Sequence, residues 1–331
     1  MIKSVSGRET DRLNNNLSAL PINYCLSHKK GVIMIQKIVE CVPNISEGRN
    51  PAVVAECVNA VASVEGVKVL HFTSDYDHNR SVITFVGSPE GVTEAAVRLC
   101  KKAGELIDLT KHTGEHPRMG AVDVCPFIPV KNVTEEEIIE IAKTAGRRIY
   151  EEAGIPVYLY EKAASASHRS NLADVRKGQF EGLSEKTKLP EWQPDFGTGF
   201  HPTAGITIVG AREFLIAFNI ELETDDVEIA KKIAKTIRFS SGGYPCVKAL
   251  GLMLHETNTA QVSINFTDFK TTSLYTVVEK VREEAKKYGT SVKCTELIGL
   301  SPMKALIDSA AYYLNIKDFD YNNQVFENHL L

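Results

Sequence analysis

The order of predicted strands and helices constrains the fold of this chain more than any other feature. Short apolar runs typical of strands alternate with longer stretches in which apolar residues recur at the helical period. Along residues 37–130 the pattern predicts strand, helix, strand, strand, helix, strand, and the same order returns along residues 214–298. A β-α-β-β-α-β unit of this kind forms a sheet with its helices on one face.

Three predicted helices begin at residues that cap helices well. Asn50 and Ser88 each stand directly before a proline, and proline is favoured at the first helical position. Thr134 and Glu137 have the spacing of a capping box. These helices are expected to run to about residues 63, 106 and 153. The segment 161–205 has no clear period, and a segment of that length inside a folded chain is typically functional or a linker.

We therefore predict an α+β protein with two consecutive βαββαβ subdomains of the ferredoxin-like type and a ligand cleft between them. The expected boundaries are residues 36–213 for the first subdomain and 214–318 for the second. Residues 1–35 are polar and Asn/Ser-rich without a period, so we expect a disordered N-terminal extension. Residues 319–331 are expected to form a C-terminal tail.

The composition is that of an ordinary globular protein, with 43% hydrophobic residues and a formal net charge of −4. No apolar stretch reaches the roughly 20 residues of a membrane helix, so no membrane partner is expected. The mild negative charge also argues against a nucleic-acid partner. The seven cysteines are spread along the chain without a C-x-x-C pair, which is typical of free thiols in a reducing compartment such as the cytoplasm.

Residues 109–123 (LTKHTGEHPRMGAVD) form the most informative stretch, because two histidines, acidic and basic residues and two glycines stand between a helix and an apolar strand. Histidine is the side chain that exchanges protons readily near neutral pH. Pro117 biases the backbone of His116 away from helix, so His116 should project from an extended turn. The stretch predicts a metal-free proton-transfer site, with a solvated loop as the plainer alternative.

The same stretch contains the letters H-x-x-E-H over residues 112–116, a pattern of helical zinc sites. That pattern requires a helix, so that ligands one turn apart share a face. Gly114 lies inside it and Pro117 follows it, and both disfavour a continued helix. We therefore expect no metal here, with zinc as the minor alternative.

Three other polar segments are candidates for ligand contact. Residues 74–80 (SDYDHNR) connect two strands; Asp and Asn are good turn formers, but Asn79 and Arg80 are also suited to bind a substrate carboxylate. At the end of the first strand, Asn44 is placed to face a cleft, although Gly48 and Asn50 have turn and capping uses. Residues 195–205 carry three glycines that allow close approach of a flat ligand, or they form a linker.

Several motifs together resemble those of the glutamate formiminotransferase family, which includes the transferase domain of formiminotransferase-cyclodeaminases. They are residues 39–48 (VECVPNISEG), 114–127 (GEHPRMGAVDVCPF), 157–160 (VYLY), 192–197 (WQPDFG) and 217–220 (AFNI). The resemblance covers about residues 35 to 315. It implies two α/β subdomains around a folate-binding cleft and transfer of a formimino group from N-formimino-L-glutamate to N5 of tetrahydrofolate, in histidine degradation.

The resemblance also implies roles for particular residues. The catalytic histidine of the family falls on His116, which would act as general base and acid without a metal. Because both substrates carry carboxylates, Arg80 and Arg118 become candidates to bind them, beside Asn44 and Asn79. The resemblance further implies a homodimer, and a transferase without the cyclodeaminase domain. The folate-contacting loop of the family falls on Gly197, Thr198, Gly199, Phe200, His201, Pro202, Thr203, Ala204 and Gly205.

Other functions stay open at the level of the sequence. Formyl transfer between N-formylglutamate and folate would use the same scaffold and the same histidine. A non-catalytic ligand-binding module is a different class, since split βαβ folds also serve as sensors. A metal hydrolase is a third alternative, and it depends on the zinc interpretation of residues 112–116.

Overall fold

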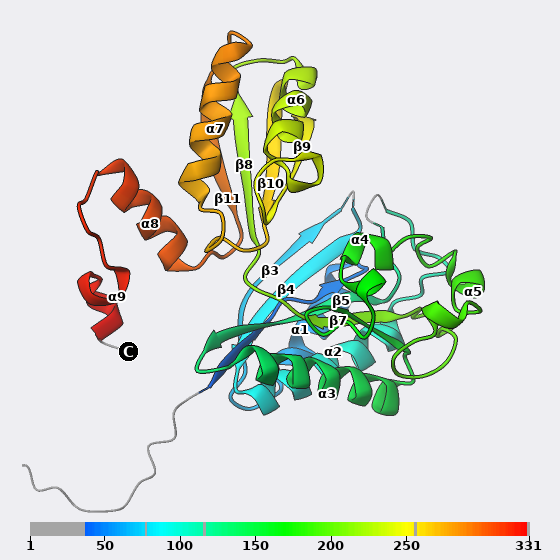
Figure 1. Cartoon of the computed structure of the whole chain (residues 1–331). Coiled ribbons are helices and arrows are strands. Elements are labelled where there is room, and N and C mark those ends of the chain that lie inside the picture. Colours follow the sequence, from blue (N-terminus) through cyan, green and yellow to red (C-terminus); the bar gives the residue numbers. More distant parts are fainter. Residues whose placement is uncertain (1–36, 77, 115–116, 255–256, 330–331) are drawn as a thin grey trace, which may run out of the picture. The chain divides into compact units, whose positions relative to one another are not determined.

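The structure is a computed structural model that describes residues 37–76, 78–114, 117–254 and 257–329 (Figure 1). Residues 1–35, expected as a disordered extension, lie outside this range. The described part is an α+β protein with two β-sheets, each covered by helices, as the sequence predicts.

The first sheet is mixed. In spatial order the strands are β3, β4, β5, β7 and β6, and the two short strands β1 and β2 both lie between β4 and β5. The pairs on the β3 side are antiparallel, whereas β7 pairs in parallel with both β5 and β6. Its strands are β1 (Ile38–Cys41), β2 (Asn44–Ile45), β3 (Lys68–Asp75), β4 (Arg80–Gly87), β5 (Val122–Lys131), β6 (Val157–Glu161) and β7 (Thr207–Ala211).

The single strand expected over residues 37–45 is divided into β1 and β2. Val42 and Pro43 interrupt it, because proline has no N–H to give to a neighbouring strand. The Pro43 carbonyl still accepts a hydrogen bond from Ile83 N–H, so the polypeptide stays in the sheet between β4 and β5.

Helices α1 (Pro51–Ala62), α2 (Pro89–Leu106) and α3 (Glu135–Ala153) cover one face of the first sheet (Figure 1). Their predicted starts are confirmed: Asn50 accepts from Ala52 N–H, and Thr134 forms both halves of a capping box with Glu137. Between helices and sheet lies the larger apolar core, which includes Phe85 and Phe127, both fully buried.

The opposite face of this sheet, along β5, β7 and β6, is covered by the predicted irregular segment. That segment contains only short helices, among them α4 (Leu172–Val175) and α5 (Leu183–Lys186). They bring Val175 and Leu183 against Tyr158 and Met119 in a second apolar cluster. The covering of this face is not predicted by the helical pattern, because these helices are too short to show a period.

The second sheet is antiparallel and has the order β11, β8, β10, β9. Helix α6 contacts β9 and β10, and α7 contacts β11 and α6, around a separate core that includes Phe218 and Phe266. After β11, helix α8 (Met303–Tyr313) packs on α7, where the rings of Tyr275 and Tyr312 stack. The elements are β8 (Ile216–Leu222), α6 (Val227–Ile237), β9 (Val247–Leu254), β10 (Thr259–Phe266), α7 (Leu274–Lys287) and β11 (Val292–Ile298). The expected tail contains a further short helix, α9 (Tyr321–Gln324).

Candidate functional site

Two segments that the sequence singled out lie against each other. We call residues 108–121 the histidine loop and residues 197–205 the glycine loop. Leu109 N–H donates to the Thr203 carbonyl over 2.8 Å, and Ala121 N–H donates to the Ala204 carbonyl over 2.9 Å. The structure thus brings together the loop that contains the predicted catalytic residue and the predicted folate-contacting loop. His116 itself lies outside the described residues.

Gly205 allows this close approach. It has φ +69°, and a Cβ at this position would stand 2.0 Å from the Met119 carbonyl oxygen. The next residue, Ile206, donates its N–H to the same carbonyl over 2.9 Å. A side chain at residue 205 would therefore strain the backbone and push the two loops apart.

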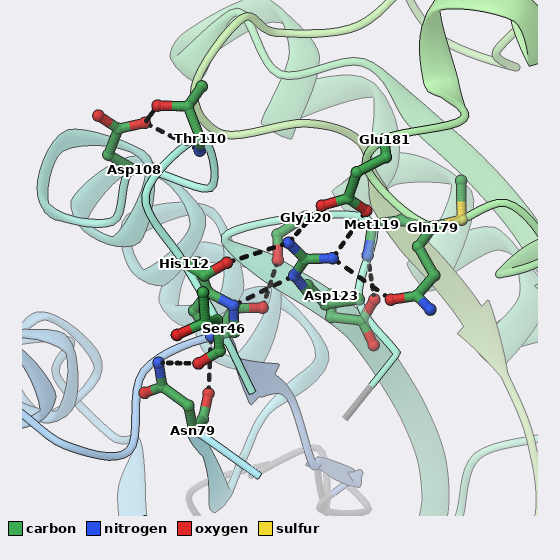
Figure 2. A network of polar contacts seen from close by, with 12 residues as sticks. Ser46, Asn79, Asp108, Thr110, His112, Met119, Gly120, Asp123, Gln179 and Glu181 are labelled. Atoms are coloured by element: carbon green, nitrogen blue, oxygen red, sulfur yellow. Dashed lines mark hydrogen bonds and ion pairs between the residues drawn. The ribbon is translucent and has the colours of Figure 1, made fainter. Parts of the chain in front are cut away.

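A third segment, at the end of the first predicted strand, joins the same site (Figure 2). Ser46 is buried and donates its hydroxyl to the Gly120 carbonyl over 2.8 Å. Asn79, with φ 48°, accepts from Gly48 N–H over 2.9 Å and donates to the Thr113 carbonyl over 3.0 Å. Asn79 was predicted to contact substrate; here its amide joins residues 48 and 113, on two different segments.

His112 belongs to this network (Figure 2), and its ring is bonded to Arg118. His112 Nε2 lies 2.9 Å from the Asn79 carbonyl oxygen, and Arg118 Nε donates to His112 Nδ1 over 3.1 Å. The guanidinium of Arg118 also binds both carboxylate oxygens of Glu181 and the side-chain oxygen of Gln179. This pairing lowers the pKa of the Glu181 carboxyl.

The geometry of Arg118 bears on its predicted role in substrate binding. Arg118 is only 7% exposed, and each of its three guanidinium nitrogens donates to a protein acceptor. Glu181, in contrast, has a side chain that is 63% exposed. A substrate carboxylate would therefore bind the fork of Arg118 only by replacing Glu181.

Arg80, the other arginine predicted to bind substrate, begins β4 and lies in a different electrostatic setting. Burial and the neighbouring cation of Arg176 lower its pKa, while Asp123 and Asp75 raise it. Asp123 is 1% exposed and accepts from Met119 N–H over 2.8 Å and from the guanidinium of Arg176. Two arginines and two carboxylates are therefore grouped at the start of β4.

The other substrate-binding candidate is Asn44, which lies on β2 between Val82 of β4 and Val124 of β5 and is half-buried. Its side-chain amide donates to the Val42 carbonyl over 3.3 Å. In the 74–80 connection, Asp75 accepts from His78 N–H, so turn formation accounts for part of that segment.

Within the glycine loop, His201 is used internally. Its Nδ1 accepts from Ala204 N–H over 2.9 Å, and its backbone exchanges two hydrogen bonds with Gly205. Phe200 packs edge-to-face on Phe180, with ring centroids 6.2 Å apart. These contacts fix the shape of the loop, and Phe200 and His201 remain partly exposed.

A buried ion pair lies directly before the glycine loop. Arg169 donates to Asp195 over 2.7 Å, and Asp195 also accepts from Leu159 N–H of β6. The guanidinium of Arg169 stacks over the rings of Tyr158 and Trp192. With side chains only 6% and 10% exposed, the pair anchors the chain that leads into the loop.

Sequence reasoning missed Glu181, Arg176 and Arg169 as parts of the site, and it included Asp195 only as the first residue of the 195–205 segment. Asp195 stands in the WQPDFG motif, which was the one signal available for this group. The others lie in the segment without a period, where no pattern relates a residue to its partner.

The zinc interpretation depends partly on residues 115 and 116, which are not described. The described residues 112–114 and 117–118 belong to no helix, as Gly114 and Pro117 predict. Within the described ranges no cluster of three or more His, Cys, Asp or Glu side chains is arranged to hold a metal ion. Among the same residues, no helix is both long and apolar enough to cross a membrane.

Comparison with known proteins gives matches along both halves of the chain. The formiminotransferase domain, N-terminal subdomain, matches residues 38–212, and the formiminotransferase domain matches residues 217–326. A glutamate formimidoyltransferase of Streptococcus pyogenes is 54% identical over 296 residues, which cover 89% of this chain and 99% of that protein. A glutamate formimidoyltransferase of Thermoplasma acidophilum is 46% identical over 86% of this chain and 95% of that protein.

A formimidoyltransferase-cyclodeaminase of Mus musculus is also 46% identical, over 84% of this chain but only 53% of its own length. The similarity therefore extends over nearly all of the two glutamate formimidoyltransferases and about half of the formimidoyltransferase-cyclodeaminase. With both subdomains matched in order and such high identity, the chain belongs to the formiminotransferase family of transferase enzymes.

Proposed function

We propose that this enzyme transfers the formimino group of N-formimino-L-glutamate to N5 of tetrahydrofolate, giving 5-formiminotetrahydrofolate and L-glutamate in histidine degradation. The observation that carries the proposal is the 54% identity to a glutamate formimidoyltransferase along 99% of that protein. Tetrahydrofolate is a co-substrate in this reaction, and we propose no metal.

We propose His116 as the general base and acid. A bond forms between N5 and the formimino carbon, and the bond from that carbon to the glutamate nitrogen breaks. His116 takes the proton that N5 loses and returns a proton to the departing amine. Such a residue typically contributes about 10²–10⁴-fold. The proposal is supported by the contact between the loop that contains residue 116 and the glycine loop.

We propose that the glycine loop, Gly197 to Gly205, contacts tetrahydrofolate. Gly197, Gly199 and Gly205 all have positive φ, so the loop folds back on itself with few side chains between its backbone and a flat ligand. The ring of Phe200 is partly exposed at this loop and offers a surface on which a planar ring can stack.

We propose that Arg80 binds a substrate carboxylate. We propose Asn44 and Asn79 as further contacts to substrate, as the sequence predicts. The support is electrostatic: burial and the cation of Arg176 lower the pKa of Arg80, and the negative charge of a bound carboxylate would favour its charged form. Arg118 was predicted to contact substrate as well, but its bonds to Glu181 and His112 favour a role in holding the histidine loop.

We propose two ferredoxin-like subdomains, at residues 36–213 and 214–318, with the substrate cleft between them; the order of elements supports this. We propose a homodimer in the cytoplasm, for which sedimentation gives the direct test of assembly. The buried free thiols of Cys41, Cys57, Cys100 and Cys125 are in keeping with a reducing compartment.

The test is an assay of the purified chain with tetrahydrofolate and each of two donors, N-formimino-L-glutamate and N-formyl-L-glutamate. The proposal predicts a folate product with the formimino donor at a kcat/KM at least tenfold above that with the formyl donor. The reverse preference would identify the enzyme as a formyltransferase. Binding of tetrahydrofolate without turnover of either donor would favour the non-catalytic module.

A further inference from the structure

The ring of His112 can have only one protonation form in this structure. Its Nε2 faces a backbone carbonyl oxygen of Asn79, which only accepts, so Nε2 must carry a hydrogen. Its Nδ1 receives a hydrogen bond from Arg118 Nε, which only donates, so Nδ1 must be unprotonated. These two contacts are satisfied together by a neutral imidazole with its hydrogen on Nε2.

This imidazole connects chain segments on both sides of residues 115 and 116. On one side, Asn79 holds the His112 ring through its carbonyl and holds the Thr113 carbonyl through its side-chain amide. On the other side, Arg118 donates to the ring of His112 and, over 3.2 Å, to its carbonyl oxygen. The residues before and after the predicted catalytic position are thus joined to each other through one ring.

Arg118 extends this connection to the covering segment of the sheet. Its backbone carbonyl accepts from Phe180 N–H over 2.9 Å, and its guanidinium binds Gln179 and Glu181 on either side. Because the side chain is almost fully buried and bonded on three sides, its position is well defined. The His112 ring is therefore held between two fixed partners.

We propose that neutral His112 is a positioning residue that locks the histidine loop, and that protonation of His112 releases the lock. A second hydrogen on Nδ1 would remove the acceptor for Arg118 and set an imidazolium against a guanidinium. The proposal rests on the proposed function, because what His112 positions is the loop that contains His116. It deepens that function by giving the reaction a second, indirect dependence on pH.

The charges around His112 keep it neutral in the working range. Burial lowers its pKa below the ordinary value of 6.5, and the cations of Arg118 and Arg49 lower it further. The hydrogen bond to Asn79 and the charge of Glu47 act in the opposite direction, and the net direction is down. Glu181 also faces this group, through its ion pair with Arg118.

The sign of the pH effect follows from this direction. The unfolded chain binds a proton at His112 near pH 6.5, whereas the folded chain binds it only at lower pH. The contribution of the lock to stability is therefore complete above about pH 6.5 and decreases as the pH falls toward the folded value. Loop order and activity should decrease together in that acid range.

The first test is a ¹⁵N NMR titration of the histidine side chains in the full chain, with His112 assigned from the spectrum of His112→Gln. The proposal predicts the shift pattern of a neutral Nε2–H ring and a midpoint below 6.5. A ring with its hydrogen on Nδ1, or a midpoint at or above 6.5, would overturn the proposal. This measurement does not use the transferase activity.

The second test compares the pH dependence of kcat in wild type, His112→Gln and a control, His71→Gln, in which an exposed histidine of β3 is changed. Gln keeps a donor for the Asn79 carbonyl, but its amide oxygen does not stand at the position of Nδ1, which accepts from Arg118, and Gln does not titrate. We expect kcat to fall by about ten- to 100-fold with KM for both substrates changed less than threefold. We also expect the pH profile of kcat in His112→Gln to lack one of the ionisations that lower the wild-type kcat in acid. The control should keep the wild-type profile.

An unchanged pH profile in His112→Gln would contradict the positioning role, even if the variant were less stable. If wild type transfers no formimino group while NMR still finds the neutral Nε2–H ring, the proposed function fails and the lock remains. If wild type is active and the ring has the other tautomer, the lock fails and the function remains. The two proposals are thus separable.

Discussion

Replacing Gly205 with alanine tests the close contact between the glycine loop and the histidine loop, where Gly205 lies against the Met119 carbonyl. The new Cβ would stand 2.0 Å from the Met119 carbonyl oxygen, and the residue would keep φ +69°. The left-handed backbone costs an L residue about 1–2 kcal/mol. Relieving the overlap by moving one loop costs about 1–3 kcal/mol more. We therefore expect the free energy of unfolding to fall by about 2–5 kcal/mol.

The matched control is Gly199→Ala in the same loop. Gly199 has φ +61°, but nothing lies within 4 Å of its added Cβ. This variant should lose only the backbone contribution, about 1–2 kcal/mol. The difference between the two variants, about 1–3 kcal/mol, corresponds to roughly a 5- to 150-fold difference in the unfolding equilibrium.

The assay is urea unfolding followed by the fluorescence of Trp192, the single tryptophan of the chain. Both variants should keep the wild-type m-value, so that the midpoints report stability. Gly205→Ala should also raise KM for tetrahydrofolate more than Gly199→Ala does. Equal midpoints for the two alanine variants would refute the reasoning, because of these two glycines only Gly205 lies against the histidine loop.

Three further predictions concern single side chains. Arg169→Met leaves the Asp195 carboxylate buried without its cation and should cost about 3–5 kcal/mol in urea unfolding, with partial recovery on adding Asp195→Asn; no recovery would contradict the ion pair. Burial raises the pKa of Glu40 to about 7 from 4.5, so the wild type should lose about 2–3 kcal/mol of stability as the pH rises from 4.5 to 7. Glu40→Gln should remove that loss; equal slopes in both proteins would contradict it. Arg80→Ala should raise KM for formiminoglutamate or tetrahydrofolate at least tenfold, and unchanged kinetics would exclude Arg80 from substrate binding.

The parts of the fold that local sequence determines were predictable. Asn50 and Thr134 cap helices where expected, because a side-chain oxygen and the first N–H groups of a helix lie within three residues of each other. The alternation of apolar residues likewise located both sheets. The division of the first strand at Pro43 was missed, although proline gives a local signal for it.

The site was less predictable, because its contacts join distant segments. The sequence indicated that residues 109–123 and 195–205 are both functional, but nothing in either segment shows that Ala121 bonds to Ala204. Glu181 was not recognised at all, since a carboxylate in a segment without a period has no visible partner. Arg118 shows the reverse case: its chemistry suits a substrate carboxylate, and the fold supplies a carboxylate of its own.

The most direct test of the central claim is the rate of formimino transfer to tetrahydrofolate by wild type and by His116→Ala at neutral pH. We expect kcat to fall by about 10²–10⁴-fold. The urea midpoint should stay that of the wild type, and the affinity for tetrahydrofolate should change less than about twofold. A variant that keeps more than a tenth of the wild-type kcat would contradict His116 as the proton-transfer residue.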